Sequence, residues 1–187
     1  MGGGNLGLMV EMTIYGVSFD LVGKQPIVLL KTAEGNRYLP IWIGHPEAAA
    51  ILMKLQGTDA PRPLTHDLLV NILSELDVDV VRVTVTELRE NTFHASITVA
   101  QNGSEIEIDS RSSDAIAVAV RAHAPIFAAD EVIEESAIEM EGDEVNEEEI
   151  VSEFRSFLDK VSAEDFAEAE SDEEEAGDGE EAEREED

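Results

Sequence analysis

The most constraining feature of this sequence is a stretch at residues 108–125 in which an alternating strand leads directly into an apolar helix. Ile106 and Ile108 alternate with acidic residues, which is the two-residue period of a strand with one apolar face. Alanine, valine and isoleucine fill residues 115–120, and Pro125 is expected to end the helix. A helix of small apolar side chains can pack closely on a sheet, so the fold is predicted to combine a sheet with buried helices.

A polar corner, Ser110-Arg-Ser-Ser-Asp114, joins that strand to that helix. Ser112 is predicted to cap the helix, because a serine hydroxyl at this position accepts a free backbone N–H. Asp114 places a negative charge at the positive end of the helix dipole. We expect this corner to hold functional side chains rigidly. The alternative is that Arg111 and Asp114 only pair with each other and cap the helix.

The remainder of residues 9–138 alternates between strand and helix patterns. Strands are expected at 9–20, 27–32, 38–43, 78–87, 92–100 and 104–109. Helices are expected near 45–56, 65–76, 112–123 and 130–138. Thr65 is expected to cap the second helix. The pattern predicts a single compact α/β (α+β) domain with a mixed, largely antiparallel sheet flanked by helices.

Charge divides the 187 residues into two parts. The chain has 43 acidic and 12 basic residues, and its formal net charge is −31. Residues 139–187 hold 24 of the acids and three of the bases, but residues 1–138 are acidic as well and contain only three lysines. We interpret this as adaptation to a salt-rich cytoplasm, where a Debye length of about 3 Å at 1 M salt screens self-repulsion. Acidic drift without such adaptation is the alternative.

The ends of the chain are predicted to lie outside the domain. Residues 1–8 are expected to be a flexible lead-in, 139–169 an acidic segment with an amphipathic helix, and 170–187 a disordered acidic tail. No apolar run reaches the ~18–20 residues of a membrane span, and no signal peptide is visible. Because cysteine is also absent, we expect a cytoplasmic protein without disulfides.

Acids in the first turns of three predicted helices, with two arginines and two histidines close by, could form one site. Such a mixture could bind a divalent metal, or bind phosphate while activating water. Helix N-termini, however, favour anions over cations. Capping acids paired with nearby arginines would also explain each residue separately. The candidate residues are His45, Glu47, Arg62, His66, Asp67, Arg111 and Asp114.

Four segments together resemble the bifunctional nuclease domain family, formerly catalogued as a domain of unknown function. They occur in the family's order and with similar spacing. The segments are Leu39-Pro-Ile-Trp-Ile-Gly44 with Glu47-Ala48, Arg62-Pro-Leu-Thr-His-Asp-Leu68, Asn91-Thr-Phe-His-Ala95, and Ile108 to Arg121 with Ala124-Pro-Ile126. The family usually has Arg-Pro-Ser-Asp where this chain has Arg111-Ser-Ser-Asp114, so the proline is lost and the arginine, serine and aspartate are kept.

The resemblance implies an α/β domain that self-associates and, as in plant members, cleaves RNA and DNA without strong sequence choice. The carboxylates would hold Mg²⁺ or Mn²⁺ or activate water, the histidine would move the proton, and the arginines would stabilise the developing charge. The predicted catalytic residues are Glu47, His66, Asp67 and Asp114. The predicted substrate-binding residues are Arg62, Arg111 and Ser113.

A second hypothesis is a non-enzymatic, oligomeric domain that binds a small anion or regulates a partner, with a helix near residues 151–166 as the docking element. The net charge of −31 favours it, because nucleic-acid affinity comes largely from basic groups. Carboxylates gathered beside a cleft would favour the enzyme. Arginine–aspartate pairs closed upon themselves would favour the binding domain.

Overall fold

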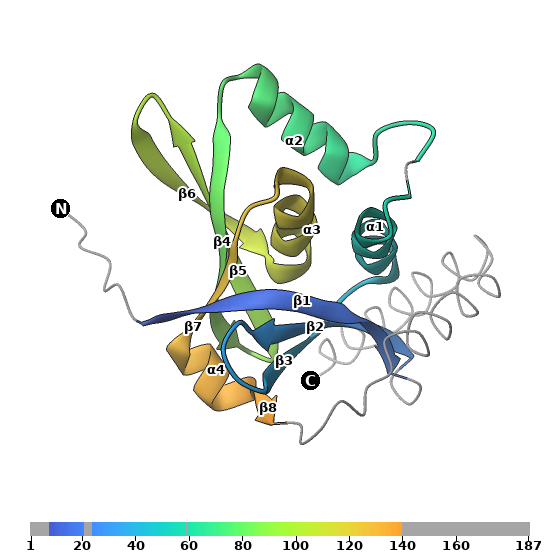
Figure 1. The fold of residues 1–187 in the computed structure, drawn as a ribbon, viewed down its shortest axis with the longest axis vertical. Coiled ribbons are helices and arrows are strands. Elements are labelled where there is room, and N and C mark those ends of the chain that lie inside the picture. Colours follow the sequence, from blue (N-terminus) through green and yellow to red (C-terminus); the bar gives the residue numbers. More distant parts are fainter. Residues whose placement is uncertain (1–7, 21–23, 59, 140–187) are drawn as a thin grey trace, which may run out of the picture.

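The computed structural model describes residues 8–20, 24–58 and 60–139, which fold into one sheet and four helices (Figure 1). The strands are β1 (Met9–Asp20), β2 (Gln25–Thr32), β3 (Arg37–Trp42), β4 (Asp79–Arg89), β5 (Thr92–Gln101), β6 (Ser104–Arg111), β7 (Ile126–Ala129) and β8 (Ile138–Glu139). The helices are α1 (His45–Leu55), α2 (Thr65–Glu75), α3 (Ser112–Ala122) and α4 (Asp130–Ser136). The predicted fold class is confirmed.

The sheet joins two antiparallel meanders through one short strand. Its strand order is β6-β5-β4-β7-β1-β2-β3-β8. Neighbouring strands pair antiparallel within β1–β2–β3 and within β4–β5–β6. β7 lies between the meanders, antiparallel to β1 and parallel to β4. The sheet is therefore mixed, and the parallel pair of β4 and β7 helps to join the two meanders.

α3 is the central helix of the domain. It contacts both α1 and α2 and packs on β4 and β5. Figure 1 shows these three helices together on one side of the sheet and α4 on the other. Every side chain from Ala115 to Ala119 is buried, as the small apolar residues of this stretch predict. Close packing of α3 therefore fixes the positions of α1 and α2 beside it.

Two segments near the end of the domain differ from the prediction. The apolar residues at 126–128 belong to strand β7 in the middle of the sheet, where no strand was predicted. The helix expected at 130–138 ends at Ser136, and Ile138 begins the two-residue strand β8. Both differences arise because strand pairing depends on distant partners, which local periodicity does not report.

The two predicted N-caps are also wrong. Ser112 and Thr65 are the first helical residues of α3 and α2, and neither preceding residue makes a side-chain capping bond. At α2 the capping contact comes from inside the helix, because the Asp67 Oδ2 accepts a hydrogen bond from the Leu64 N–H at 2.9 Å. Asp67 in the first turn thus satisfies a backbone N–H that has no partner within the helix.

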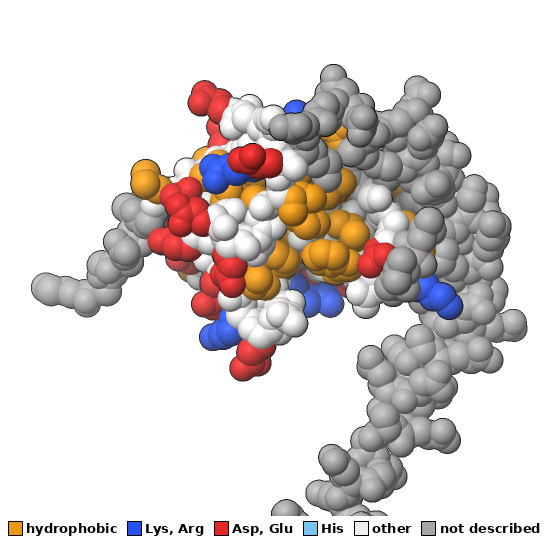
Figure 2. Space-filling view, turned by 90° about the horizontal axis from the view of Figure 1, so that it is seen from below, with side chains coloured by type: hydrophobic (Ala, Val, Ile, Leu, Met, Phe, Trp, Pro, Cys, Tyr) orange, Lys and Arg blue, Asp and Glu red, His pale blue; other side chains and the backbone are white. Residues whose placement is uncertain are grey.

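The acidity of the chain extends over its folded part. In the view from below, hydrophobic side chains gather near the middle of the face and acidic side chains gather along its left side (Figure 2). No helix in the described ranges combines the length and apolar character needed to cross a membrane. The predicted lead-in at 1–8, acidic segment at 139–169 and tail at 170–187 fall, except for Leu8 and Glu139, outside the described residues.

Candidate functional site

Arg111 and Asp114 form the centre of a polar cluster at the corner between β6 and α3. Arg111 ends β6, and Asp114 lies in the first turn of α3. The Arg111 Nε donates to Asp114 Oδ2 at 2.7 Å, and Nη2 donates to Oδ1 at 3.0 Å. The guanidinium is therefore bound to the carboxylate through two parallel hydrogen bonds, which fix its orientation.

Two other helices each add one side chain to this corner. His66 in the first turn of α2 has its Nε2 3.0 Å from Asp114 Oδ1, the oxygen that also accepts from Arg111. Glu47 in the first turn of α1 accepts from Arg111 Nη2 through its Oε1 at 3.0 Å. We call Glu47, His66, Arg111 and Asp114 the Arg111 cluster. The N-terminal turns of α1, α2 and α3 thus meet at one carboxylate.

The charges in the cluster reinforce one another. Burial alone raises the pKa of Asp114, but the hydrogen bonds from Arg111 and His66 outweigh it, so the pKa lies below its ordinary 3.8. The hydrogen bond to Asp114 raises the pKa of Arg111 against the opposing effect of burial, and Glu47 adds to the rise. Asp114 and Arg111 are therefore both ionised at neutral pH.

Arg111 is held on one edge and open on the other. Its side chain is 67% exposed, and its Nη1 makes no hydrogen bond to any residue in the described ranges. A guanidinium has five N–H donors in a fixed plane. Since the carboxylates of Asp114 and Glu47 occupy Nε and Nη2, the free Nη1 donors are presented to solvent in a fixed direction.

Gly44 allows Glu47 to take part in the cluster. Gly44 is the extended residue that precedes α1, with φ −70° and ψ 155°. A Cβ placed on Gly44 would collide with the Glu47 carboxylate. Any larger residue at this position would therefore push Glu47 out of its place beside Arg111. Glycine is needed here for close approach and not for an unusual backbone angle.

Asp67, the residue after His66, belongs to a second group of contacts. Its Oδ1 accepts a 2.6 Å hydrogen bond from the Nε of Arg121 in the last turn of α3. The Arg121 side chain is only 4% exposed, and it also donates to the backbone oxygens of Ala117 at 3.0 Å and Ala50 at 3.1 Å. Burial opposes the shift, but the bonds from Leu64 and Arg121 lower the pKa of Asp67. This pair ties α2 and α1 to α3.

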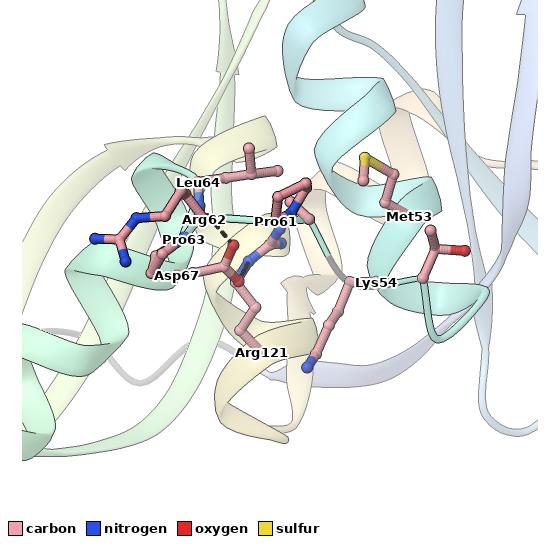
Figure 3. A pocket seen from close by; sticks show the side chains of 10 residues that line it. Met53, Lys54, Pro61, Arg62, Pro63, Leu64, Asp67 and Arg121 are labelled. Carbon is pink, nitrogen blue, oxygen red and sulfur yellow. Dashed lines mark hydrogen bonds and ion pairs between the residues drawn. The ribbon is translucent and has the colours of Figure 1, made fainter.

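The Asp67–Arg121 pair forms part of the wall of a surface cavity of about 230 Å³ (Figure 3). The cavity lies between the last turn of α1, the loop that leads to α2, and the last turn of α3. Arg62 and Lys54 are the other charged residues that line it. The apolar and small polar residues of the wall are Met53, Thr58, Ala60, Pro61, Pro63 and Leu64.

The seven predicted site residues therefore do not form a single site. Glu47, His66, Arg111 and Asp114 form the cluster, whereas Arg62 and Asp67 line the cavity and Ser113 is buried in the first turn of α3. Arg121 was not predicted. Its signal in the sequence is a charged residue within an otherwise apolar helix, seven positions after Asp114 and so close to the same face.

The donor set of the Arg111 cluster does not fit a divalent metal. Both oxygens of Asp114 accept hydrogen bonds, and Arg111 lies between Asp114 and Glu47 where a cation would have to bind. In the ranges that the structure describes, no three His, Asp or Glu side chains are arranged to hold a metal ion. The geometry instead places a guanidinium and an imidazole beside one carboxylate, an arrangement that can bind an anion and transfer a proton.

Comparison with known proteins gives two findings. A family model described as the bifunctional nuclease domain matches residues 28–141, which include the Arg111 cluster and the cavity. Two uncharacterized proteins of Mycobacterium tuberculosis, from strains CDC 1551 / Oshkosh and ATCC 25618 / H37Rv, are each 39% identical over 165 residues. The matched region covers 84% of this chain and 98% of each relative.

Proposed function

The chain belongs to the bifunctional nuclease domain family, and from this membership we propose that it is a nuclease that hydrolyses phosphodiester bonds of RNA and DNA with little sequence preference. The observation that carries the proposal is the shared carboxylate of Asp114, which bonds His66 and Arg111 through the same oxygen. A proton carrier and a phosphate-binding group therefore lie side by side. A cytoplasmic location and self-association, both expected from the sequence, are part of the proposal.

His66 acts as the general base in this mechanism. Asp114 is ionised and can only accept, so the Nε2 of His66 carries the proton in their 3.0 Å contact. A neutral imidazole then has its lone pair on Nδ1, which can take a proton from water. Because DNA has no 2′-hydroxyl to act as the nucleophile, the proposed mechanism uses water on both polymers. As water gives its proton to Nδ1, its oxygen bonds to phosphorus while the P–O bond to a sugar oxygen breaks, and the leaving oxygen takes a proton from solvent. The Asp114 carboxylate stabilises the imidazolium that results.

Arg111 binds the phosphate that is attacked. Its free Nη1 donors point to solvent while Asp114 and Glu47 hold the other edge of the guanidinium. Negative charge that develops on the phosphate oxygens is then met by donors whose orientation is already set. Glu47 has a positioning role, since it touches Arg111 and is itself largely buried.

A second candidate function is a non-enzymatic domain that binds a small anion. The observation in its favour is that both arginine–aspartate pairs, Arg111–Asp114 and Arg121–Asp67, are closed upon themselves. Such pairs satisfy most of the charge within the protein. In this function Arg111 would still bind a phosphate through Nη1, but no bond would be cleaved.

The test is cleavage of labelled single-stranded RNA and DNA by the full-length protein, in high salt, with EDTA or with Mg²⁺ or Mn²⁺. His66→Gln is expected to lower kcat by about 10²–10⁴-fold, the usual contribution of a general base, with the melting temperature kept. His123→Asn is the matched control, because His123 is exposed at the far end of α3 and asparagine tolerates its positive φ of 54°. Binding without cleavage under every condition would favour the anion-binding domain instead.

A further inference from the structure

α1 and α3 lie side by side and run in the same direction. Glu47 in the first turn of α1 bonds Arg111 just before α3, and the oxygen of Ala50 in the middle of α1 accepts from Arg121 in the last turn of α3. The cluster and the cavity are therefore two places along one helix pair. Lys54 follows Glu47 by seven residues, and Arg121 follows Asp114 by seven. Counted from backbone positions at 1.5 Å per residue, the two places are about 10.5 Å apart along the helices.

The cavity is positive in a strongly negative chain. Lys54, Arg62 and Arg121 line it, and Asp67 is the one acid among the lining residues that the structure describes. Three of the nine basic residues in 1–138 thus surround one small space, although the chain carries a net charge of −31. This local excess of positive charge favours an anion where most of the surface would repel one.

Two of these three bases have donors to spare. Arg121 is fixed by Asp67 and two backbone oxygens, but Lys54 and Arg62 make no ion pair with any residue of the described part. Figure 3 shows them on opposite sides of the Asp67–Arg121 pair, with the Arg62 guanidinium directed outward. Arg62 lies between Pro61 and Pro63, whose rings restrict the backbone of this loop. Its exposed side chain can turn toward a ligand in the cavity.

We propose that this cavity is a second phosphate subsite, which holds one backbone phosphate of a single-stranded nucleic acid while another phosphate of the same strand is bound at Arg111. This proposal rests on the proposed nuclease function. One strand carries a phosphate every 3.4 Å or so along a stacked helix, and the spacing is longer when the strand is extended. The ~10.5 Å between the two places therefore corresponds to about two or three phosphates.

The size and surroundings of the cavity favour a phosphate on a single strand. Its volume of about 230 Å³ is below the ~300–1,000 Å³ typical of pockets for drug-sized ligands, so it suits a phosphate group better than a whole nucleotide. A duplex presents two charged strands and requires a broad basic surface. Here three basic residues line one small cavity instead of a broad surface, which suits one strand.

The test measures how KM depends on strand length. Full-length wild type, Lys54→Gln and Arg62→Gln are given labelled single strands from dinucleotide to hexanucleotide at one salt concentration. In wild type, KM is expected to fall once the strand is long enough to span both places. In either variant, KM is expected to stay nearly the same as the strand lengthens. Arg37→Gln on β3 is the control of equal charge, and it is expected to keep the wild-type dependence on length.

Binding of the same strands with a cleavage-resistant phosphorothioate backbone, followed by fluorescence anisotropy, gives a readout that does not need activity. Loss of one phosphate contact is expected to make the plot of log K against log salt less steep, by about 0.7 in slope. Cleavage with equal KM at all lengths in wild type, or a duplex bound more tightly than a single strand, would overturn the subsite alone. Length-dependent binding that both variants lose, without any cleavage, would support the subsite and overturn the nuclease function.

Discussion

At the scale of single residues, Asp114 holds the Arg111 cluster together. Its oxygens accept two hydrogen bonds from Arg111 and meet His66 as well. Bonds from charged donors stabilise the ionised form, so this carboxylate is a weak proton acceptor. Its physical role is to orient the guanidinium and the imidazole. The proton-transfer role in the proposed mechanism therefore falls on His66.

Replacing Asp114 with Asn is expected to give a stability loss that depends on pH. The folded-state pKa of Asp114 is lowered, so its stabilising contribution is present above the ordinary 3.8 and disappears as the pH falls through the lower folded value. Urea unfolding should show wild type more stable than Asp114→Asn at pH 7. The gap should narrow below about pH 4. A gap of equal size at pH 7 and pH 3 would contradict this account.

Asp67→Asn is expected to destabilise the domain by about 3 kcal/mol, because Arg121 would keep a buried charge without its partner. Cleavage per folded molecule should be retained, since the hydrogen bonds of Asp67 go to Leu64 and Arg121 and not to the cluster. Chemical denaturation and cleavage measured on one sample separate the two effects. Loss of cleavage with unchanged stability would restore the catalytic role predicted for Asp67.

At the scale of elements, α3 decides where the functional side chains lie. Its buried stretch from Ala115 to Ala119 lets it pack against both α1 and α2. Its first turn carries Asp114 and its last turn carries Arg121, so each end receives a side chain from the neighbouring helices. The small side chains in the middle bring the helices close enough for these hydrogen bonds.

Ala115→Leu is expected to lower the free energy of unfolding by about 1–3 kcal/mol, because the extra methylene groups have no space beside the sheet. The displacement of α3 should also weaken cleavage by moving Asp114 relative to His66. Ala122→Leu, at a less buried position in the same helix, is the control. Differential scanning calorimetry would show equal melting temperatures for the two variants if packing at Ala115 were loose.

α2 differs most from what its sequence pattern predicts. Its leucines and isoleucines recur at helical spacing, a pattern typical of a buried face, yet none of its residues is buried. The side chains of Leu68 and Ile72 are 53% and 46% exposed, and Ile106 and Ile108 of the edge strand β6 are exposed as well. Self-association, which the family resemblance implies, remains a prediction, and these apolar side chains are where we expect its contacts.

At the scale of the whole molecule, negative charge governs behaviour in solution. The folded part is acidic, and residues 139–187 add the larger share of the net charge of −31. Self-repulsion of this kind weakens a compact state at low ionic strength and is screened by salt. The cavity between α1, α2 and α3 is locally positive, unlike the acidic molecule as a whole. We therefore expect any nucleic-acid binding to depend on that local charge more than on the molecule's net charge.

Deleting residues 170–187 removes twelve acids and one arginine. The melting temperature at fixed salt is expected to change by less than about 2–4 °C, the shift that 1 kcal/mol produces in a chain of this size. The reason is that this segment has almost no apolar side chains to bury. Thermal unfolding in 0.1 M and 1 M salt would test it, and a larger drop would show that the tail packs on the domain.

Local patterns in the sequence were sufficient for most of the secondary structure and for part of the site. Strand and helix periods depend on neighbouring residues, so the helices near 45–56, 65–76 and 112–123 were predicted to within a residue or two of their ends. Acids in first turns follow from the helix dipole, and Glu47 and Asp114 were found by that rule. The family resemblance rests on such local segments as well.

Tertiary structure alone decided which charges meet. Asp67 pairs with Arg121 and not with Arg62, although Arg62 is nearer in the sequence, because the packing of α2 on α3 sets which side chains face each other. The place of β7 and the exposure of α2 were decided in the same way. Ion pairing, strand pairing and burial all depend on residues far apart in the chain, and their relative positions exist only once the helices have packed on the sheet.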